Sequence, residues 1–268
     1  MIDDFRADLS PLELPTPLRT YRFDIRDQTG STQTELEAAV ERGDACDGQV
    51  LVTDAQTLGR GRRGRTWASP PGVNLYASIA LDLPVPLPRA LQYQFVAALS
   101  VFHSLCRETG QDGFWIKWPN DIWRGERKLA GILLTAHNRS DSATSAVLGI
   151  GINVNATADQ LPAEASSLLM ECGRVFNRGG LLVRILRSLT EWEDVWRSRG
   201  WNTISDAWQR ASRVAGCEAS VPGLLGGEGQ LLILGLGEYG ELLVEDATGR
   251  RRTLTQADVS IRMRKCFS

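Results

Sequence analysis

One nine-residue segment, residues 59–67, constrains the fold of this chain more than any other. Its first seven residues hold three glycines and four arginines, and Trp67 closes it. Glycines interrupt helices and strands and let the backbone come close to a ligand, while arginine guanidinium groups match phosphate and carboxylate oxygens. The tryptophan supplies a flat face for an adenine or another ring. This segment, called the arginine loop below, predicts a loop that becomes ordered over a polyphosphate.

The composition confines this cationic character to the loop. The 268 residues carry 32 acidic and 30 basic side chains and a net charge of −2, whereas bulk nucleic-acid binding needs a broad basic surface. Hydrophobic residues make up 43% of the chain, enough for a sizeable core. No apolar run approaches the ~20 residues of a membrane span, and the N-terminus lacks a signal-peptide core. We therefore expect a globular, cytoplasmic protein with a local anion site.

Cysteine and histidine are too few and too scattered to predict a metal centre. The chain has two histidines and five cysteines, and the cysteines form no CxxC pair. This pattern predicts reduced thiols, no disulfide framework and no zinc site. The cysteines are Cys46, Cys106, Cys172, Cys217 and Cys266, the last of which receives no predicted role.

Strand and helix patterns alternate along the first 211 residues. Hydrophobic periodicity predicts strands at 21–25, 50–53, 73–81, 114–118, 129–136 and 146–154, and helices at 32–43, 88–109, 178–198 and 203–211. A capping-box pattern from Thr32 to Glu35 starts the first helix, and Gly43 ends it. The strand at 50–53 delivers the chain into the arginine loop.

The character of the sequence changes near Ser212. Glycine-rich turns then separate short alternating runs at 231–234, 241–245 and 252–254, which is typical of a small all-β module. Residues 1–20 contain three prolines and are expected to be irregular. The predicted organisation is a lead-in at 1–25, a main domain at 26–211 and a β module at 212–268.

Three further motifs follow the arginine loop. They are KWPND at 117–121, KLAGIL at 128–133 and GIGINVN at 149–155. Each has an ordinary structural explanation: a turn between strands, a solvated strand end, and a closely packed strand. Taken together and in this order, the four segments resemble the catalytic domain of biotin protein ligases, from about residue 27 to residue 262.

The resemblance implies both a fold and an activity. The expected fold class is α+β, a mixed β-sheet backed by helices like that of class II synthetases, with a C-terminal SH3-like β-barrel. In the implied reaction, the carboxylate of biotin attacks the α-phosphate of ATP to give biotinyl-5′-AMP and pyrophosphate. A lysine of a biotin carboxyl carrier domain then attacks the acyl carbon, and AMP leaves. Mg²⁺ is expected with ATP, and no metal site of the protein's own is expected.

The resemblance also implies roles for individual residues. Lys128 would grip the carboxylate and the α-phosphate, Arg62 would retain the acyl-adenylate, and Asp121 would position a metal ion or the incoming lysine. The biotin-binding residues implied are Ser31, Thr32, Gln33, Gln56, Arg60, Gly61, Arg62 and Lys128. The ATP-binding residues implied are Arg60, Arg62, Arg63, Arg65, Trp67, Asn120, Lys128 and Asn153.

The implied partners are biotin, ATP and the biotin carboxyl carrier domain of acetyl-CoA carboxylase or a related carboxylase. About 25 residues precede the catalytic region, so no DNA-binding domain is expected, and neither is a membrane; a homodimer is compatible with the family. Three alternatives stay open. They are a lipoate or octanoyl protein ligase, a non-catalytic nucleotide- or RNA-binding module, and a biotin-binding paralogue that does not transfer biotin. The last is suggested by Gln33, which replaces the asparagine usual in the family.

Overall fold

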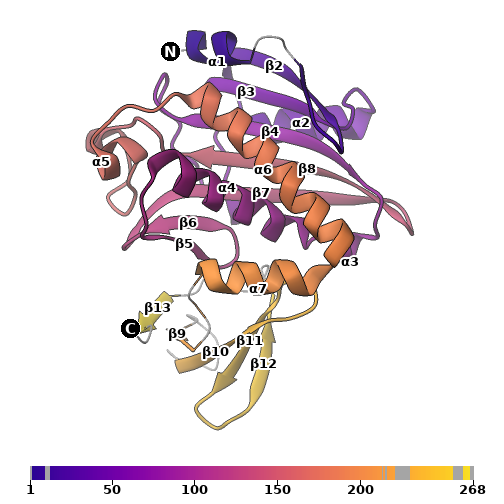
Figure 1. Ribbon diagram of the computed structural model, residues 1–268, viewed down its shortest axis with the longest axis vertical. Helices are drawn as coiled ribbons and strands as arrows, with labels where there is room; N and C mark the ends of the chain where they lie inside the picture. Colours follow the sequence, from indigo (N-terminus) through magenta and orange to yellow (C-terminus); the bar gives the residue numbers. More distant parts are fainter. Residues whose placement is uncertain are drawn as a thin grey trace.

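A large sheet covered by helices and a smaller sheet below it make up the molecule (Figure 1). The computed structural model describes residues 2–9, 13–212, 214, 216–220, 230–255 and 262–265, so Cys266 lies outside the described residues. Within that part of the chain, no helix combines the length and the apolar character needed to cross a bilayer.

The large sheet is mixed, as predicted. Its strands are β1 (Glu13–Pro15), β2 (Thr20–Thr29), β3 (Gln49–Gln56), β4 (Leu75–Leu83), β5 (Phe114–Lys117), β6 (Asp121–Arg124), β7 (Arg127–Ser140) and β8 (Ala143–Ile152). Their order across the sheet is β1-β2-β3-β4-β8-β7-β6-β5. Strands β2 and β3 run parallel, and the other neighbouring pairs are antiparallel. This order brings the second half of the KLAGIL motif on β7 beside the first half of the GIGINVN motif on β8.

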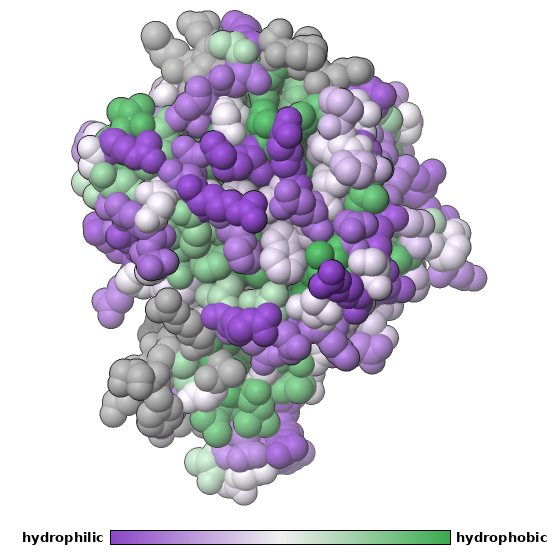
Figure 2. All heavy atoms as spheres, viewed as in Figure 1, coloured by the Kyte–Doolittle hydropathy of each residue, from purple (hydrophilic) through white to green (hydrophobic). Residues whose placement is uncertain are grey.

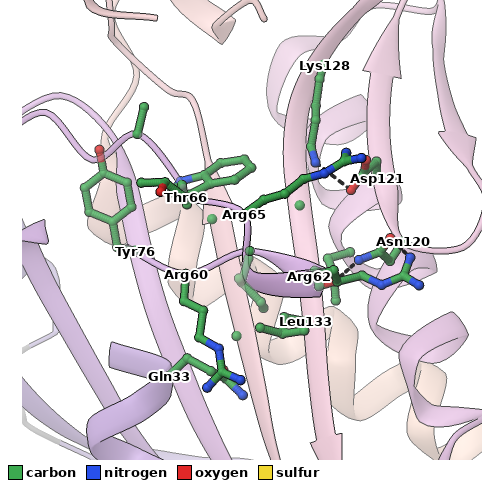
Figure 3. A pocket seen from close by; sticks show the side chains of 18 of the residues that line it. Gln33, Arg60, Arg62, Arg65, Thr66, Tyr76, Asn120, Asp121, Lys128 and Leu133 are labelled. Carbon is green, nitrogen blue, oxygen red and sulfur yellow. Dashed lines mark hydrogen bonds and ion pairs between the residues drawn. The ribbon is translucent and has the colours of Figure 1, made fainter. Parts of the chain in front are cut away.

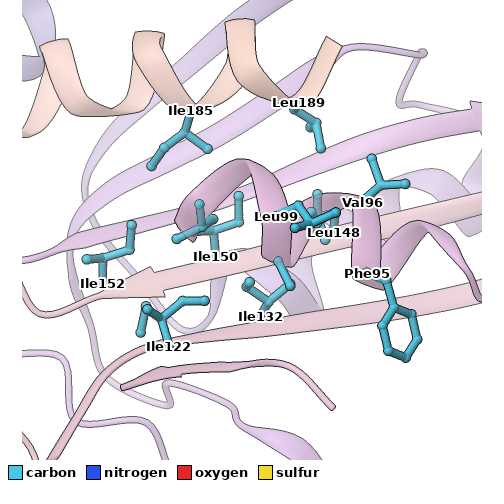
Figure 4. Close-up of a cluster of buried hydrophobic side chains, with 14 of the residues drawn as sticks. Phe95, Val96, Leu99, Ile122, Ile132, Leu148, Ile150, Ile152, Ile185 and Leu189 are labelled. Atoms are coloured by element: carbon cyan, nitrogen blue, oxygen red, sulfur yellow. The ribbon is translucent and has the colours of Figure 1, made fainter. Parts of the chain in front are cut away.

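Helices cover both faces of this sheet. They are α1 (Ile2–Asp8), α2 (Thr32–Arg42), α3 (Leu87–Ala90), α4 (Tyr93–Thr109), α5 (Leu168–Cys172), α6 (Arg178–Arg199) and α7 (Trp201–Ser212), with 3₁₀ turns η1 (Arg62–Gly64) and η2 (Ala158–Gln160). Because successive strand residues point to opposite faces, Val50 and Val52 join the main core while Leu51 packs with Leu36 of α2 in a smaller cluster. Figure 4 shows the main core, where Leu99 of α4 and Ile185 of α6 lie over the strands.

Local signals position the start of α2. The hydroxyl of Ser31 accepts a hydrogen bond from Thr34 N at 3.4 Å, and the carboxylate of Glu35 accepts one from Gly30 N at 3.1 Å. The helix ends at Gly43, whose φ of 78° is the left-handed conformation that glycine adopts most readily. The helix cap is therefore Ser31, one residue earlier than the predicted capping box.

The predicted β module is a five-stranded antiparallel sheet. Its strands are β9 (Glu218–Ser220), β10 (Gln230–Leu236), β11 (Leu242–Asp246), β12 (Arg251–Leu254) and β13 (Arg262–Lys265), in the order β12-β11-β10-β9-β13. The β10–β11 turn lies against the main domain, where Trp118 Nε1 donates to Gly240 O and Trp201 Nε1 donates to Gly237 O, both at 3.0 Å. Figure 2 shows apolar surface over this sheet.

Several sequence-based expectations are wrong in detail. Residues 1–20, expected to be irregular, include α1 and the edge strand β1. The expected helix at 88–109 is divided into α3 and α4, because Gln92 N bonds to Arg89 O three residues back and tightens the chain there. Strand β6 was not predicted. Cys46, Cys106 and Cys172 are free thiols, but Cys217 is disulfide-bonded, so the expectation of no disulfide fails there.

Candidate functional site

A cavity of about 1060 Å³ lies on the α2 side of the large sheet. Its floor is the face of β4, β7 and β8 that points away from α4 and α6. On β4 and β8, Ser78, Gly149 and Gly151 face the cavity, and they alternate with Leu148 and Ile150, which belong to the main core. The 2.0-residue period of the strands therefore separates a packed apolar face from a polar, glycine-lined one.

The glycines of β8 make room for two large side chains. A Cβ atom at Gly151 would lie 2.7 Å from the ring of Trp67, and one at Gly149 would overlap Oε1 of Gln33. The GIGIN motif thus allows Trp67 and Gln33 to lie directly on the sheet. Neither side chain would fit in its observed position above an alanine.

The arginine loop is folded over this cavity as a short hairpin. Arg60 and Thr66 form an antiparallel bridge, and Gly61 N donates to Arg65 O at 2.7 Å. Between them, Arg63 adopts a left-handed conformation with φ of 56°, within the turn η1. The loop predicted from the sequence therefore has a defined backbone, and its own hydrogen bonds contribute to that order.

The arginines of the loop point in different directions. A guanidinium nitrogen of Arg60 lies 3.2 Å from a carboxylate oxygen of Glu37 on α2. Arg62 donates to Oδ1 of Asn120 at 3.1 Å, while Figure 3 shows Arg65 extending toward Asp121 at the opposite side of the cavity. Burial lowers the pKa of Arg62 from its ordinary value. A cation with reduced hydration of this kind favours an anionic ligand.

Lys128 and Asp121 form an ion pair in the wall of the cavity. Their charged atoms are 2.8 Å apart, and both side chains are about a quarter exposed, at 28% and 24%. The ammonium group also lies 5.2 Å from the centre of the Trp67 ring, within the range of a cation–π contact. The lysine, the carboxylate and the indole therefore form one cluster, although they come from three separate motifs.

A second lysine, Lys117, lies in the same wall. Its ammonium is 4.0 Å from the centre of the Trp123 ring, and burial lowers the pKa of the amine. Lys117 is the first residue of the KWPND motif, but no role was predicted for it from the sequence. The antiparallel strands β5 and β6 hold its charge in place. Of these two strands, β6 was not predicted.

The start of α2 contributes a hydrogen-bonded set. The amide oxygen of Gln56 accepts from the backbone N of Thr32 at 2.9 Å, and its Nε2 donates to Oγ of Ser69 at 2.9 Å. Ser78 donates its hydroxyl to Thr32 Oγ1 at 2.9 Å. Ser78 was not predicted. The signal was a serine in the middle of a mostly apolar strand.

The amide of Gln33 already has several protein partners. Its Nε2 donates to Glu37 Oε1 at 2.8 Å and lies 3.2 Å from Thr135 Oγ1 and 3.1 Å from Val147 O. Its Oε1 lies 3.3 Å from Ser78 Oγ. Gln33 lines the cavity, but the structure gives it the role of a floor residue whose polar atoms bind the surrounding protein.

The nucleotide-binding candidates at the other end are buried. Asn153 is 3% exposed, and its Nδ2 donates to Ser166 O at 3.0 Å. Asn120 is 4% exposed, and its Nδ2 donates to Ile132 O. The indole N–H of Trp67 is buried without a hydrogen-bond partner in the described part of the chain. A buried donor of this kind favours an acceptor on a ligand.

The structure brings all the predicted site residues to this one cavity. They are Ser31, Thr32, Gln33, Gln56, Arg60, Gly61, Arg62, Arg63, Arg65, Trp67, Asn120, Asp121, Lys128 and Asn153. The lining also includes Ser78, Lys117 and Trp123, which were not predicted.

The charge of the lining suits a polyanion. Its cations are Arg60, Arg62, Arg63, Arg65, Lys117 and Lys128, against the two carboxylates Asp121 and Glu164. This excess of positive charge in a partly enclosed site would hold a phosphate chain and offset charge that develops on it.

Comparisons with known proteins show which family this chain resembles. The model of the biotin/lipoate A/B protein ligase family matches residues 26–153. The bifunctional ligase/repressor BirA of Bacillus spizizenii is 31% identical over 253 residues, covering 92% of this chain and 76% of the relative. The biotin–[acetyl-CoA-carboxylase] ligase of Mycobacterium tuberculosis is 32% identical over 193 residues, 69% of each chain. A solved structure, the biotin protein ligase from Aquifex aeolicus in complex with biotin and ATP, is 29% identical with a TM-score of 0.74, covering 90% of this chain and 99% of that one.

Proposed function

The chain belongs to the biotin protein ligase family, and we propose that it activates biotin with ATP and transfers it to a lysine of a biotin carboxyl carrier domain. The observation that supports this most directly is the cavity itself. It collects the arginine loop, Lys128, Asp121, Asn153 and the start of α2 around one space, although they are separated by up to about 120 residues in the chain. Two of the proteins compared above, from Mycobacterium tuberculosis and Aquifex aeolicus, are biotin ligases by name, so a lipoate or octanoyl ligase is not favoured.

The first step of this reaction opposes like charges, because a carboxylate must approach a triphosphate. Lys128 and the arginine loop provide the compensating cations, and the 2.8 Å contact with Asp121 fixes the position of the Lys128 ammonium before ligands bind. A charge held in place beforehand stabilises the transition state without having to reorganise. Arg62, tied to Asn120, is placed to bind the carboxylate and the α-phosphate together.

Biotin and adenine occupy different parts of the cavity in this proposal. The ureido ring lies near Ser31, Thr32 and Gln56, whose hydroxyl and amide groups both donate and accept hydrogen bonds. Trp67 and Asn153 lie at the nucleotide end, beyond Lys128. The valeryl chain lies between the two ends, against the Gln33 and Trp67 side chains that cover Gly149 and Gly151.

Mg²⁺ is expected to enter with ATP. Among the described residues, no group of three His, Cys, Asp or Glu side chains could hold a metal ion. Mg²⁺ usually binds through one or two carboxylates and the phosphates of its nucleotide. Asp121 and Glu164 in the cavity lining fit that requirement, and the ion would offset part of the triphosphate charge.

The second step requires the acceptor lysine to reach the acyl carbon at the mouth of the cavity. We place the catalytic unit at residues 26–211 and an SH3-like module at 212–268, with its β10–β11 turn against Trp118. A cytoplasmic location belongs to the same proposal, because ATP and a carboxylase have to be available together. Homodimer formation and the absence of DNA binding stay predictions of the sequence.

A mass-spectrometric transfer assay tests the function. The protein is incubated with Mg-ATP, a biotin carboxyl carrier domain, and either biotin or lipoate. We expect a biotin-sized mass increase on one acceptor lysine and none from lipoate. An acceptor in which that lysine is replaced by arginine serves as the matched control and should stay unlabelled. Biotin binding by calorimetry without any transfer would instead favour the non-transferring paralogue, and labelling by lipoate would favour the lipoate ligase.

A further inference from the structure

We propose that Glu37 is a positioning residue that latches the arginine loop to α2 and couples it to the floor of the cavity at Gln33. This inference rests on the proposed function for its role in catalysis, but the latch itself is a feature of the fold. Glu37 does not line the cavity and belongs to none of the four motifs. It would act through Arg60 and Gln33, which do line it.

The two oxygens of the Glu37 carboxylate have different partners. Oε2 lies 3.2 Å from a guanidinium nitrogen of Arg60, in the arginine loop. Oε1 accepts a hydrogen bond of 2.8 Å from Nε2 of Gln33, one helical turn earlier on α2. One side chain therefore joins the roof of the cavity to its floor. Figure 3 shows the Arg60 side chain extending toward Gln33, away from Lys128.

The burial of the Glu37 carboxylate favours a real contribution from this contact. The Glu37 side chain is 14% exposed, whereas that of Arg60 is 51% exposed. A carboxylate so poorly solvated gains more from a cation than a fully exposed one does. Because the carboxylate is held by the rigid helix α2, the mobile partner is the loop arginine. The ion pair therefore orders the loop rather than the helix.

The position of Arg60 determines where the latch acts. Arg60 begins the loop hairpin through its bridge to Thr66, whereas Arg62 makes a separate contact with Asn120. The loop is thus held at its base by Glu37 and at its tip by Asn120. Loss of the Glu37 contact would release the base and raise the fraction of molecules with an open loop.

The Gln33 side of the latch links the loop to the biotin end of the cavity. Gln33 lies over Gly149 and contacts Thr135 of β7 and Val147 of β8. A ligand that presses on Gln33 would move the carboxylate that holds Arg60. This arrangement makes loop closure sensitive to what occupies the floor of the cavity.

Limited trypsin digestion tests the latch without any ligand, because trypsin cleaves after arginine and the loop contains four. The variant is Glu37→Gln, which has nearly the same shape and can still accept the bond from Gln33 but loses the charge that binds Arg60. The matched control is Glu41→Gln, one turn further along α2 at an exposed position. Cleavage after Arg62, Arg63 and Arg65 is followed by mass spectrometry.

We expect Glu37→Gln to raise the loop cleavage rate roughly twofold to fivefold, the effect of losing one partly exposed ion pair. Glu41→Gln should match the parent protein. Arg60→Gln should raise the rate as Glu37→Gln does, and the double variant should show no further increase, because both changes break the same contact. Equal rates in the parent and Glu37→Gln, or fully additive effects in the double variant, would overturn the latch.

A second readout tests the role in catalysis. Release of biotinyl-5′-AMP from the protein without acceptor requires an open loop, so Glu37→Gln should speed release by the same factor as cleavage. The rate of adenylate formation should change less than twofold, because Lys128 and Arg62 are untouched. Faster cleavage with unchanged release would overturn the positioning role. If the parent protein forms no adenylate, the proposed function fails, while the digestion result still decides on the latch.

Discussion

The ammonium of Lys128 lies 2.8 Å from the carboxylate of Asp121, and this ion pair faces the ring of Trp67 across the cavity wall. The two residues come from neighbouring strands, β7 and β6, and from different sequence motifs. Asp121 thereby fixes a flexible side chain at the point where a carboxylate and a phosphate would meet. Because the pair is partly exposed, it contributes more to the orientation of the Lys128 side chain than to the stability of the fold.

Replacing Lys128 with alanine should slow adenylate formation by roughly 10²–10³-fold, the usual effect of removing one charge aimed at a transition state. The fold should be retained, because the lysine is a partly exposed residue near the start of a strand. Biotin-dependent release of pyrophosphate measures the rate. The control is Arg127→Ala, which removes the adjacent cation on β7, one that pairs with Glu171 at 2.9 Å. A near-normal rate in Lys128→Ala would remove this residue from the mechanism.

Replacing Arg62 with glycine should loosen retention of the acyl-adenylate. Arg62 is partly buried and bonded to Asn120 at the tip of the loop, so its loss opens one wall of the cavity. Loss of a hydrogen bond from a charged group corresponds to roughly a tenfold to hundredfold faster escape. Escaped adenylate acylates exposed lysines on any protein, so labelling of an added bystander protein measures it. Labelling confined to the carrier domain would contradict the role given to Arg62.

The sequence predicted residues that line one cavity, because most of them fall in short, contiguous motifs. The arginine loop and the KLAGIL and GIGIN segments each carry a local signal of glycine spacing or strand pattern, and their order along the chain specified the family. The helix α2 could be predicted for the same reason, because the residues at its start and Gly43 at its end are local signals. Local patterns of this kind require no knowledge of how the strands are ordered.

Contacts between distant segments could not be predicted in the same way. Gln33 meets Thr135 and Val147, more than 100 residues away, because β7 and β8 are neighbours in the sheet. The amide was expected to face the ligand, but these partners occupy its polar atoms. Ser78 and Lys117 were not predicted. Whether a polar strand residue lines the cavity depends on which face of the sheet it occupies, and that face is known only once the strands are arranged. Strand β6 was missed because KWPND was interpreted as a turn alone.

Gly149→Ala should weaken biotin binding by about 1–3 kcal/mol, the usual cost of overpacking. The added Cβ would overlap Oε1 of Gln33, whose amide is held by several protein contacts and cannot move freely. Gln33→Asn shortens the opposing side chain by one methylene and should restore part of the affinity in the double variant. Calorimetric titration with biotin measures all three proteins. Purely additive effects of the two substitutions would show that Gln33 does not limit the space above Gly149.

Gly240→Ala should separate the small sheet from the main domain, and Gly249→Ala provides a matched control. Both glycines lie in turns of the small sheet with left-handed φ values of 86° and 80°, so alanine adds the same backbone strain of about 1 kcal/mol at each. The difference is the environment: a Cβ at Gly240 would overlap the ring of Phe95 on α4, whereas nothing lies within 4 Å of one at Gly249.

The Gly240 turn also accepts the indole N–H of Trp118, which lines the cavity beside Asn120. Gly240→Ala should therefore lower the thermal midpoint more than Gly249→Ala does and also raise the KM for ATP, because displacing the turn releases Trp118. Thermal unfolding and pyrophosphate release, measured on both variants, test the two effects separately. Equal midpoints would mean that the turn is not tightly packed on Phe95. A lower midpoint with an unchanged KM would mean that Trp118 keeps its position without the Gly240 carbonyl.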